Sequence, residues 1–159
     1  MTLAIYPGSF DPITNGHLDV LKTGAEIFDK VIIAVARNPQ KDGFLSADER
    51  IELIKESVAG LKNVEVDSFE GLTINYARAK GAKVLIRGLR AVSDFEYEMQ
   101  LSQTNRALDD SIKTVFLITR PKYNFISSST VKEILCNGGD ISKFVPDAVY
   151  KRLKPEIKH

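Results

Sequence analysis

Two polar side chains, Ser9 and His17, lie in a stretch near the start of the chain that glycine and proline interrupt. The stretch follows apolar residues 3–5, which are typical of a buried strand, and it precedes an amphipathic helical pattern. Free N–H groups, the positive end of a helix dipole and the close approach that glycine allows make such a turn suited to a phosphate. Ser9 offers a hydroxyl, and His17 is expected to be a donor that carries charge near neutral pH. The alternative is an ordinary turn in which Thr14 caps the helix.

Two arginines form a second candidate site directly after an apolar run. Arg87 and Arg90 flank Gly88, which permits close approach, and the planar guanidinium matches phosphate oxygens. A charged pair at the end of a core strand is costly without a partner. An anion site is the favoured interpretation, and the alternative is that both arginines pair with acidic residues of the following helix. Those acidic residues are Asp94, Glu96 and Glu98.

Three further segments carry groups suited to an anion or its metal. Lys41 lies in the polar loop 37–46, where a lone lysine is otherwise a solvated charge. The hydroxyl run 127–130 opens a helix, so its N–H and O–H groups can hold a triphosphate. Thr130 is expected to cap that helix through a capping box. Thr73 is expected to cap an earlier helix, in a turn that follows a strand.

The composition limits the classes of protein to consider. Hydrophobic residues make up 43% and charged residues 27% of 159 residues, which indicates one globular domain, expected to span 1–159. The net charge of +1 predicts no nucleic acid and no membrane as partner. The single cysteine, Cys136, excludes an intrachain disulfide and is expected to be a small packing residue in a helix. No targeting or membrane-spanning segment is evident, so the cytoplasm is the expected compartment.

Apolar, β-branched runs alternate with helical patterns along the chain. Strands are predicted over 3–5, 31–36, 64–66, 83–86 and 114–118. Helices are predicted after residue 17 and near 47–58, 73–80, 92–108, 129–137 and 146–153.

This alternation predicts an α/β fold, a doubly wound, five-stranded parallel sheet with helices on both faces. Strands one, two, four and five are nearly continuously apolar, so burial on both of their faces is expected. Ligands of such sheets bind at the carboxyl ends of the strands. The loops there are 6–17, 37–46, 68–73, 87–92 and 119–129. Neither the dinucleotide fingerprint nor the P-loop motif follows the first strand, which argues against a dehydrogenase and a P-loop kinase.

Three separated motifs resemble one known family. The string GSFDPITNGH, ending at His17, resembles the TxGH signature of nucleotidyltransferases related to class I aminoacyl-tRNA synthetases, and bacterial phosphopantetheine adenylyltransferases in particular. The run IRGLRAVSDFEYE, residues 86–98, is similar to the same family, and the hydroxyl run matches its ISSS motif. The resemblance extends from Ala4 to about Pro146 and implies a Rossmann-like nucleotidyltransferase fold. It departs from the synthetase KMSKS loop, whose place ISSS takes, because the lysine is missing.

The resemblance assigns roles to residues of this sequence. Catalytic roles fall to His17, Lys41, Ser9 and Arg90. ATP binding is implied for Ser9, Phe10, His17, Gly88, Leu89, Arg90, Glu98, Tyr123, Asn124, Phe125, Ile126, Ser127, Ser128 and Ser129. Acceptor binding is implied for Ser9, Lys41, Leu72, Thr73, Arg87 and Asn105. No residue is assigned as a protein ligand of a metal.

The implied reaction joins ATP to 4′-phosphopantetheine and gives dephospho-coenzyme A and pyrophosphate. No side chain near these loops is an activated nucleophile, so direct in-line attack by the acceptor phosphate is expected, with Mg²⁺ accompanying ATP. The family also implies a homohexamer and coenzyme A as a feedback inhibitor. Two alternatives remain: transfer of an adenylyl or cytidylyl group to another phosphate acceptor, such as nicotinamide mononucleotide, and a nucleotide sensor without turnover.

Overall fold

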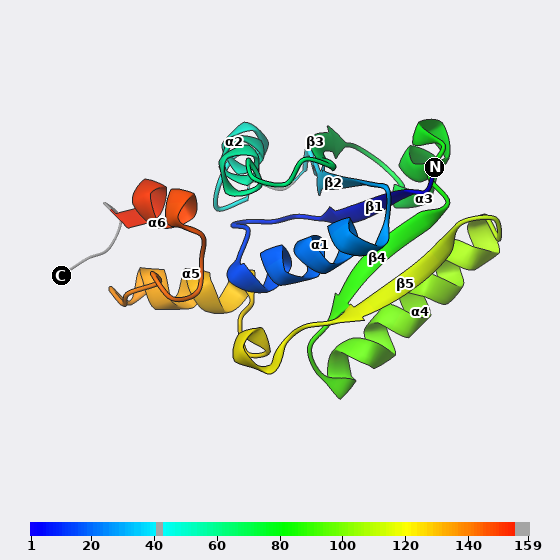
Figure 1. Cartoon of the computed structure of the whole chain (residues 1–159). Coiled ribbons are helices and arrows are strands. Elements are labelled where there is room, and N and C mark those ends of the chain that lie inside the picture. The colour runs from blue at the N-terminus through cyan, green and yellow to red at the C-terminus, as the bar shows by residue number, and fades with distance from the viewer. Residues whose placement is uncertain (41–42, 155–159) are drawn as a thin grey trace.

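Five parallel strands form one sheet with the order β3-β2-β1-β4-β5 (Figure 1). In this computed structural model, residues 1–40 and 43–154 are described, apart from the side chains of Val92 and Ser93. The strands are β1 (Leu3–Gly8), β2 (Lys30–Ala36), β3 (Val64–Phe69), β4 (Val84–Leu89) and β5 (Lys113–Ile118). The predicted doubly wound parallel sheet is therefore confirmed, and each predicted strand is present.

Helices connect the strands and cover both faces of the sheet. They are α1 (Asn15–Ile27), α2 (Ala47–Ser57), α3 (Thr73–Lys80), α4 (Val92–Leu108), α5 (Ser128–Cys136) and α6 (Asp147–Leu153), with a short 3₁₀ turn at Pro121–Tyr123. After β5 the chain continues through α5 and α6, which Figure 1 shows beyond the carboxyl ends of the strands. In the described chain, no helix is both long enough and apolar enough to cross a membrane.

Alternate residues of the central strands point to opposite faces of the sheet and pack into two separate hydrophobic cores. Tyr6 and Ile33 pack on one face, with buried side chains of α1, α2, α5 and α6. Ile5 and Ile32 pack on the other face with α3. Helix α4 lies on this second face, where Phe95 contacts Phe116 of β5. Right-handed crossovers produce this division, because the chain moves outward from β1 to β3 and then returns to the other side of β1.

Two expectations about burial are wrong. The residues of strand β5 are at most half-buried, and Ile118 is 84% exposed, because β5 lies at the edge of the sheet and pairs with β4 on one side. Cys136 is exposed rather than packed. It is the last residue of α5, whose buried face is formed by Val131 and Leu135, so its position on the helix points it to solvent.

The strands β1 and β4 separate at their carboxyl ends. Their pairing covers two positions, Ala4 with Val84 and Ile5 with Leu85, whereas β1 and β2 pair at six. Beyond this point Nη1 of Arg87 donates to the carbonyl of Pro7 at 3.2 Å. A side-chain hydrogen bond therefore connects the two strands where their backbone pairing has ended. The chain reverses its direction of winding between these two strands, and such a switch point is where doubly wound sheets bind ligands.

Candidate active site

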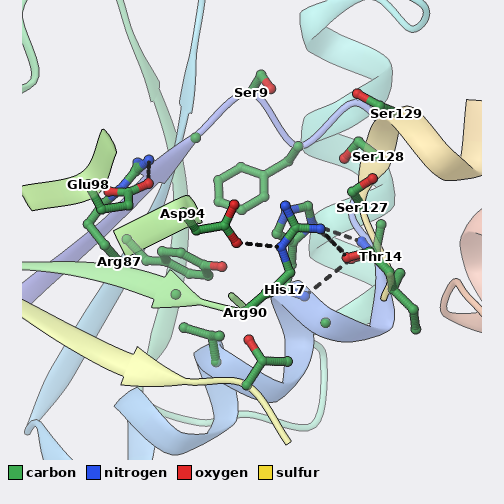
Figure 2. A pocket seen from close by; sticks show the side chains of 18 of the residues that line it. Ser9, Thr14, His17, Arg87, Arg90, Asp94, Glu98, Ser127, Ser128 and Ser129 are labelled. Carbon is green, nitrogen blue, oxygen red and sulfur yellow. Dashed lines mark hydrogen bonds and ion pairs between the residues drawn. The ribbon is translucent and has the colours of Figure 1, made fainter. Parts of the chain in front are cut away.

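A cavity of about 380 Å³ opens where β1 and β4 separate, and its size suits a small-molecule site (Figure 2). Its walls come from β1, the turn after it, α1, β4, α4 and the start of α5. Predicted site residues that line it are Ser9, Phe10, His17, Arg87, Gly88, Arg90, Glu98, Ile126, Ser127, Ser128 and Ser129. The structure thus brings together the three motifs that lie far apart in the sequence.

The turn after β1 orients the imidazole of His17. Thr14 is the N-cap of α1, and its hydroxyl accepts from the His17 backbone N–H at 3.3 Å. In return, the backbone N–H of Thr14 donates to Nδ1 of His17 at 3.0 Å. Because Nδ1 accepts a backbone proton, the neutral ring carries its own proton on Nε2. The cap proposed as the ordinary alternative is therefore present, and it also fixes the histidine that the cavity contains.

The expected charge on His17 is wrong. Burial, which is the largest cause, and the nearby cations Arg90 and Arg87 together lower the pKa of His17 to about 4. A buried imidazolium beside two guanidinium groups would be poorly solvated and repelled. His17 is therefore a neutral Nε2–H donor near pH 7, and the positive charge of the cavity comes from the arginines.

Phe10 supports the same imidazole from the side. Its ring makes an edge contact with His17, with 5.0 Å between centroids, and another with Tyr6 at 5.2 Å. Phe10 has φ of 48°, a left-handed conformation that costs a non-glycine residue about 1–2 kcal/mol. The surrounding packing must maintain this conformation, which directs the ring toward His17.

Arg87 and Glu98 form a bidentate ion pair across one wall of the cavity. Nε of Arg87 donates to Oε2 of Glu98 at 2.8 Å, and Nη2 donates to Oε1 at 2.7 Å (Figure 2). Glu98 is buried, and Arg87 is half-buried. The acidic partner considered as an alternative for Arg87 is therefore present. Since the pair lies in the cavity wall, a phosphate that binds Arg87 meets a guanidinium already held in place.

Arg90 bridges the two sides of the cavity. Its Nη1 donates to the carbonyl of Ile126 at 2.9 Å, and its Nε lies 3.2 Å from Oδ2 of Asp94. Asp94 is thus the second acidic partner. Glu96, the remaining member of the acidic run, is exposed and does not line the cavity. Both arginines therefore pair with acids and at the same time face the cavity.

The hydroxyl run opens α5, but its cap differs from the prediction. Ser127, not Thr130, is the N-cap, because its Oγ accepts from the backbone N–H of Thr130 at 3.0 Å. Thr130 falls within the first turn, where its hydroxyl lies 2.9 Å from that of Ser127. The Oγ of Ser128 donates to the carbonyl of Pro12 at 2.8 Å, which ties this helix start to the turn after β1. Ser129 lines the cavity beside them.

Several predicted site residues lie outside the cavity wall. Leu72 is exposed and is itself the N-cap of α3, which starts at Thr73, so the expected Thr73 cap is wrong. Asn105 lies in α4 roughly 10 Å along the helix from Glu98, at 1.5 Å per residue. The others that do not line the cavity are Leu89, Tyr123, Asn124 and Phe125, while Lys41 lies outside the described residues.

Some lining residues had no assigned role in the sequence. Tyr6 is a core residue of β1, and burial raises the pKa of its phenol above the usual range, so it stays protonated. Tyr97 and Thr119 also line the cavity. Tyr97 follows Glu96 in the acidic run. Thr119 directly follows β5, and this position at the carboxyl end of a strand is the sequence signal that could have identified Thr119 as a site residue.

The chain is similar to known proteins over nearly all of its length. Residues 5–134 match the cytidylyltransferase-like family. A phosphopantetheine adenylyltransferase of Caldanaerobacter subterraneus subsp. tengcongensis is 54% identical, covering 99% of each chain. One of Gloeothece citriformis is 56% identical, covering 92% of this chain and 94% of its own. A solved Vibrio parahaemolyticus protein, a candidate nicotinate-nucleotide adenylyltransferase, shares the fold with a TM-score of 0.70 at 18% identity, covering 97% of this chain and 99% of that one.

Proposed function

This chain belongs to the phosphopantetheine adenylyltransferases, within the cytidylyltransferase-like family, and we propose that it transfers the adenylyl group of ATP to 4′-phosphopantetheine. The products are dephospho-coenzyme A and pyrophosphate, the chemistry of coenzyme A biosynthesis. The observation that carries this proposal is the identity of about half of all residues, over full length, with proteins of that name. The cavity supports it, because its donors and cations come from the motifs that the family shares.

The reaction needs alignment and charge neutralisation rather than a covalent intermediate. An oxygen of the acceptor phosphate attacks the α-phosphorus of ATP in line. The new bond joins that oxygen to the α-phosphorus, and the bond to the β-phosphate oxygen breaks, so pyrophosphate leaves with the electron pair. Nε2–H of His17 and the hydroxyl of Ser9 donate to the α-phosphate oxygens. Because His17 is neutral, it stabilises the transition state as a hydrogen-bond donor and transfers no proton.

Arginine side chains and serine hydroxyls are proposed to bind the remaining phosphate groups. Arg90 and the start of α5, residues 127–129, hold the β- and γ-phosphates. Arg87 holds the acceptor phosphate, and Lys41 orients the acceptor and the α-phosphate. For Arg90 the geometry supports the role, because its hydrogen bond to the Ile126 carbonyl places the guanidinium beside that helix start.

Mg²⁺ is proposed to enter with ATP rather than to reside in the protein. Among residues 1–40 and 43–154, no group of three or more His, Cys, Asp or Glu side chains is arranged to hold a metal. The cavity carboxylates of Asp94 and Glu98 are already paired with arginines. Mg²⁺ commonly keeps several waters and binds substrate phosphates, which fits a wall of serine hydroxyls. When bound, the ion neutralises charge on the leaving pyrophosphate, and its removal with EDTA is expected to abolish turnover.

The test is pyrophosphate release by the purified protein with ATP and Mg²⁺. Three acceptor conditions are compared: 4′-phosphopantetheine, nicotinamide mononucleotide and no acceptor. Release that depends on phosphopantetheine supports the proposal. Release with the mononucleotide alone would keep the chemistry and replace the acceptor, and saturable ATP binding without release would favour a nucleotide sensor.

Regulation and assembly extend the same proposal. Coenzyme A contains the pantetheine and adenylate parts of the product, so it is expected to compete with phosphopantetheine in initial-rate measurements. A homohexamer is proposed, and apolar side chains exposed on α4 and β5 give it a surface to bury; they are Phe95, Tyr97, Met99, Leu108 and Ile118. Native mass spectrometry should then give six times 17.7 kDa. A location in the cytoplasm is proposed, where ATP and 4′-phosphopantetheine would both be available.

A further inference from the structure

Two buried, charged residues outside the cavity join the turn after β1 to the segment before α2. Asp11 is 6% exposed and Arg50 is 8% exposed, and neither lines the cavity. Charged side chains are rarely this buried unless each is fully engaged. The proposed reaction uses neither of them, so their burial calls for another explanation.

Asp11 binds the backbone of the segment before α2 with both carboxylate oxygens. Its Oδ2 accepts from the N–H of Phe44 at 2.7 Å, and its Oδ1 accepts from the N–H of Leu45 at 2.8 Å. These contacts cross more than thirty residues of sequence. Gly43 permits this approach, because a Cβ there would lie 2.8 Å from Oδ2 of Asp11.

Arg50 makes the reciprocal connection from α2. Its Nη1 donates to the carbonyl of Ser9 at 2.8 Å, and its Nε donates to the carbonyl of Leu45 at 3.2 Å. One guanidinium therefore holds both segments, because its planar fork presents separate N–H donors in fixed directions. We define the four hydrogen bonds of Asp11 and Arg50 as the loop clamp.

The hydrogen bonds of the loop clamp hold the residues on both sides of Phe10. Ser9 is held by Arg50, Asp11 is held by two backbone N–H groups, and the residue between them has φ of 48°. Phe10 then contacts His17 with its ring. A strained conformation persists only where its surroundings determine it, and the loop clamp supplies those surroundings.

We propose that Asp11 and Arg50 are positioning residues, which hold Phe10 in its left-handed conformation and so orient His17 for the transition state. The inference rests on the proposed function for its kinetic consequence. Because the loop clamp acts on the turn that carries Ser9 and His17, the proposed donors to the α-phosphate, and leaves the proposed β- and γ-phosphate site at Arg90 and residues 127–129 untouched, its loss should lower turnover and leave ATP binding nearly intact.

The test compares Arg50→Ala and Arg50→Lys with a control on the same helix, Lys55→Ala, which removes an exposed cation. For Arg50→Ala we expect kcat to fall about 10- to 100-fold while the Kd for ATP changes less than about threefold. Arg50→Lys should recover part of kcat, since lysine reaches one carbonyl of the two, and Lys55→Ala should equal the wild type. Asp11→Asn should behave as Arg50→Ala, because its amide N–H₂ faces backbone donors.

A second readout does not depend on activity. The chain has two histidines, His17 and His159, so histidine-selective labelling gives two imidazole NMR signals, and His159→Ala identifies them. The Phe10 ring lies 5.0 Å from the His17 ring, so its ring current reports their relative position. We expect the His17 carbon-bound protons to shift in Arg50→Ala and to stay in place in Lys55→Ala, whereas simple destabilisation leaves the folded-state shifts unchanged.

Three results would overturn the proposal: unchanged kcat with unchanged His17 signals, equal losses of kcat and ATP affinity, or Arg50→Lys that cannot be obtained folded. The last result would mean that Arg50 is required for folding of the chain and not specifically for positioning the turn after β1. Failure of the proposed function is distinguishable, because it appears as absent pyrophosphate release in the wild type. The His17 signals test the loop clamp in either case.

Discussion

Arg87 and Glu98 face each other in the cavity wall through two N–H···O bonds of 2.8 and 2.7 Å. The cavity therefore balances the charge of this arginine internally before any phosphate arrives. An acceptor phosphate must share the guanidinium with Glu98 or displace it, and the pairing orients the fork meanwhile.

The stability of this pair can be measured against an exposed one. Glu98→Gln leaves a half-buried guanidinium without its carboxylate, so we expect the free energy of unfolding to fall by about 2 kcal/mol. The control is Asp110→Asn, which breaks the exposed pairs of Asp110 with Arg106 and Lys113 and should cost under about 1 kcal/mol. Urea unfolding of both variants measures the two losses of unfolding free energy. Equal losses would mean that the Arg87–Glu98 pair in the cavity wall is as well solvated as an exposed pair.

Replacing His17 separates catalysis from binding. His17→Ala removes the Nε2–H donor, and we expect kcat to fall about 10²- to 10³-fold while the Kd for ATP stays within a few-fold. Steady-state kinetics and isothermal titration with ATP measure the two quantities. His159→Ala, which removes the other histidine of the sequence, serves as the control. A parallel loss of ATP affinity and turnover would argue against a role specific to the transition state.

The lowered pKa of His17 makes stability depend on pH in a defined direction. Its pKa is about 4 in the folded protein and 6.5 in the unfolded chain, so between these values the unfolded state binds more protons. Stability should therefore fall as pH falls from 6.5 to 4, by on the order of 3 kcal/mol from this group. His17→Gln should lose less stability than the wild type between pH 7 and pH 4.5 in urea titrations. Identical pH dependence would show that His17 titrates normally.

Gly88 allows α1 to approach β4 closely. A Cβ at Gly88 would lie 2.8 Å from Cγ2 of Val20, so Gly88→Ala should cost about 1–3 kcal/mol of unfolding free energy. The second substitution Val20→Ala should restore part of that loss by making room. Gly60→Ala is the control, because nothing lies within 4 Å of a Cβ there. If the double variant were no more stable than Gly88→Ala, the clash would not be the cause.

Local sequence signals predicted the fold and most of the cavity wall well. The apolar runs 3–5 and 83–86 predicted the strands that the structure shows as β1 and β4, and the parallel fold then places the loops after them at one edge of the sheet. Ser9, His17, Arg87, Arg90 and the three serines 127–129 of the hydroxyl run line the cavity as this logic requires, whereas Thr130 does not.

The errors arise where neighbours distant in sequence decide the outcome. Thr73 and Thr130 match cap patterns, but α3 starts one residue earlier, and α5 three residues earlier, than those caps would place them. The charge of His17 depends on burial between arginines seventy residues away. The contacts of Asp11 with residues 44 and 45 have no local signature, because an Asp-Pro pair in a loop reads as an ordinary turn.

The short pairing of β1 with β4 means that the site is divided between two halves of the chain. Residues up to α3 supply Ser9 and His17, and residues from β4 onward supply Arg87, Arg90 and the serines. A chain split at Gly81, in the connection between those halves, would give two pieces that each hold half of the catalytic surface. Adenylyl transfer by the mixed pieces would then be a direct assay of their reassociation, since neither piece carries the chemistry by itself.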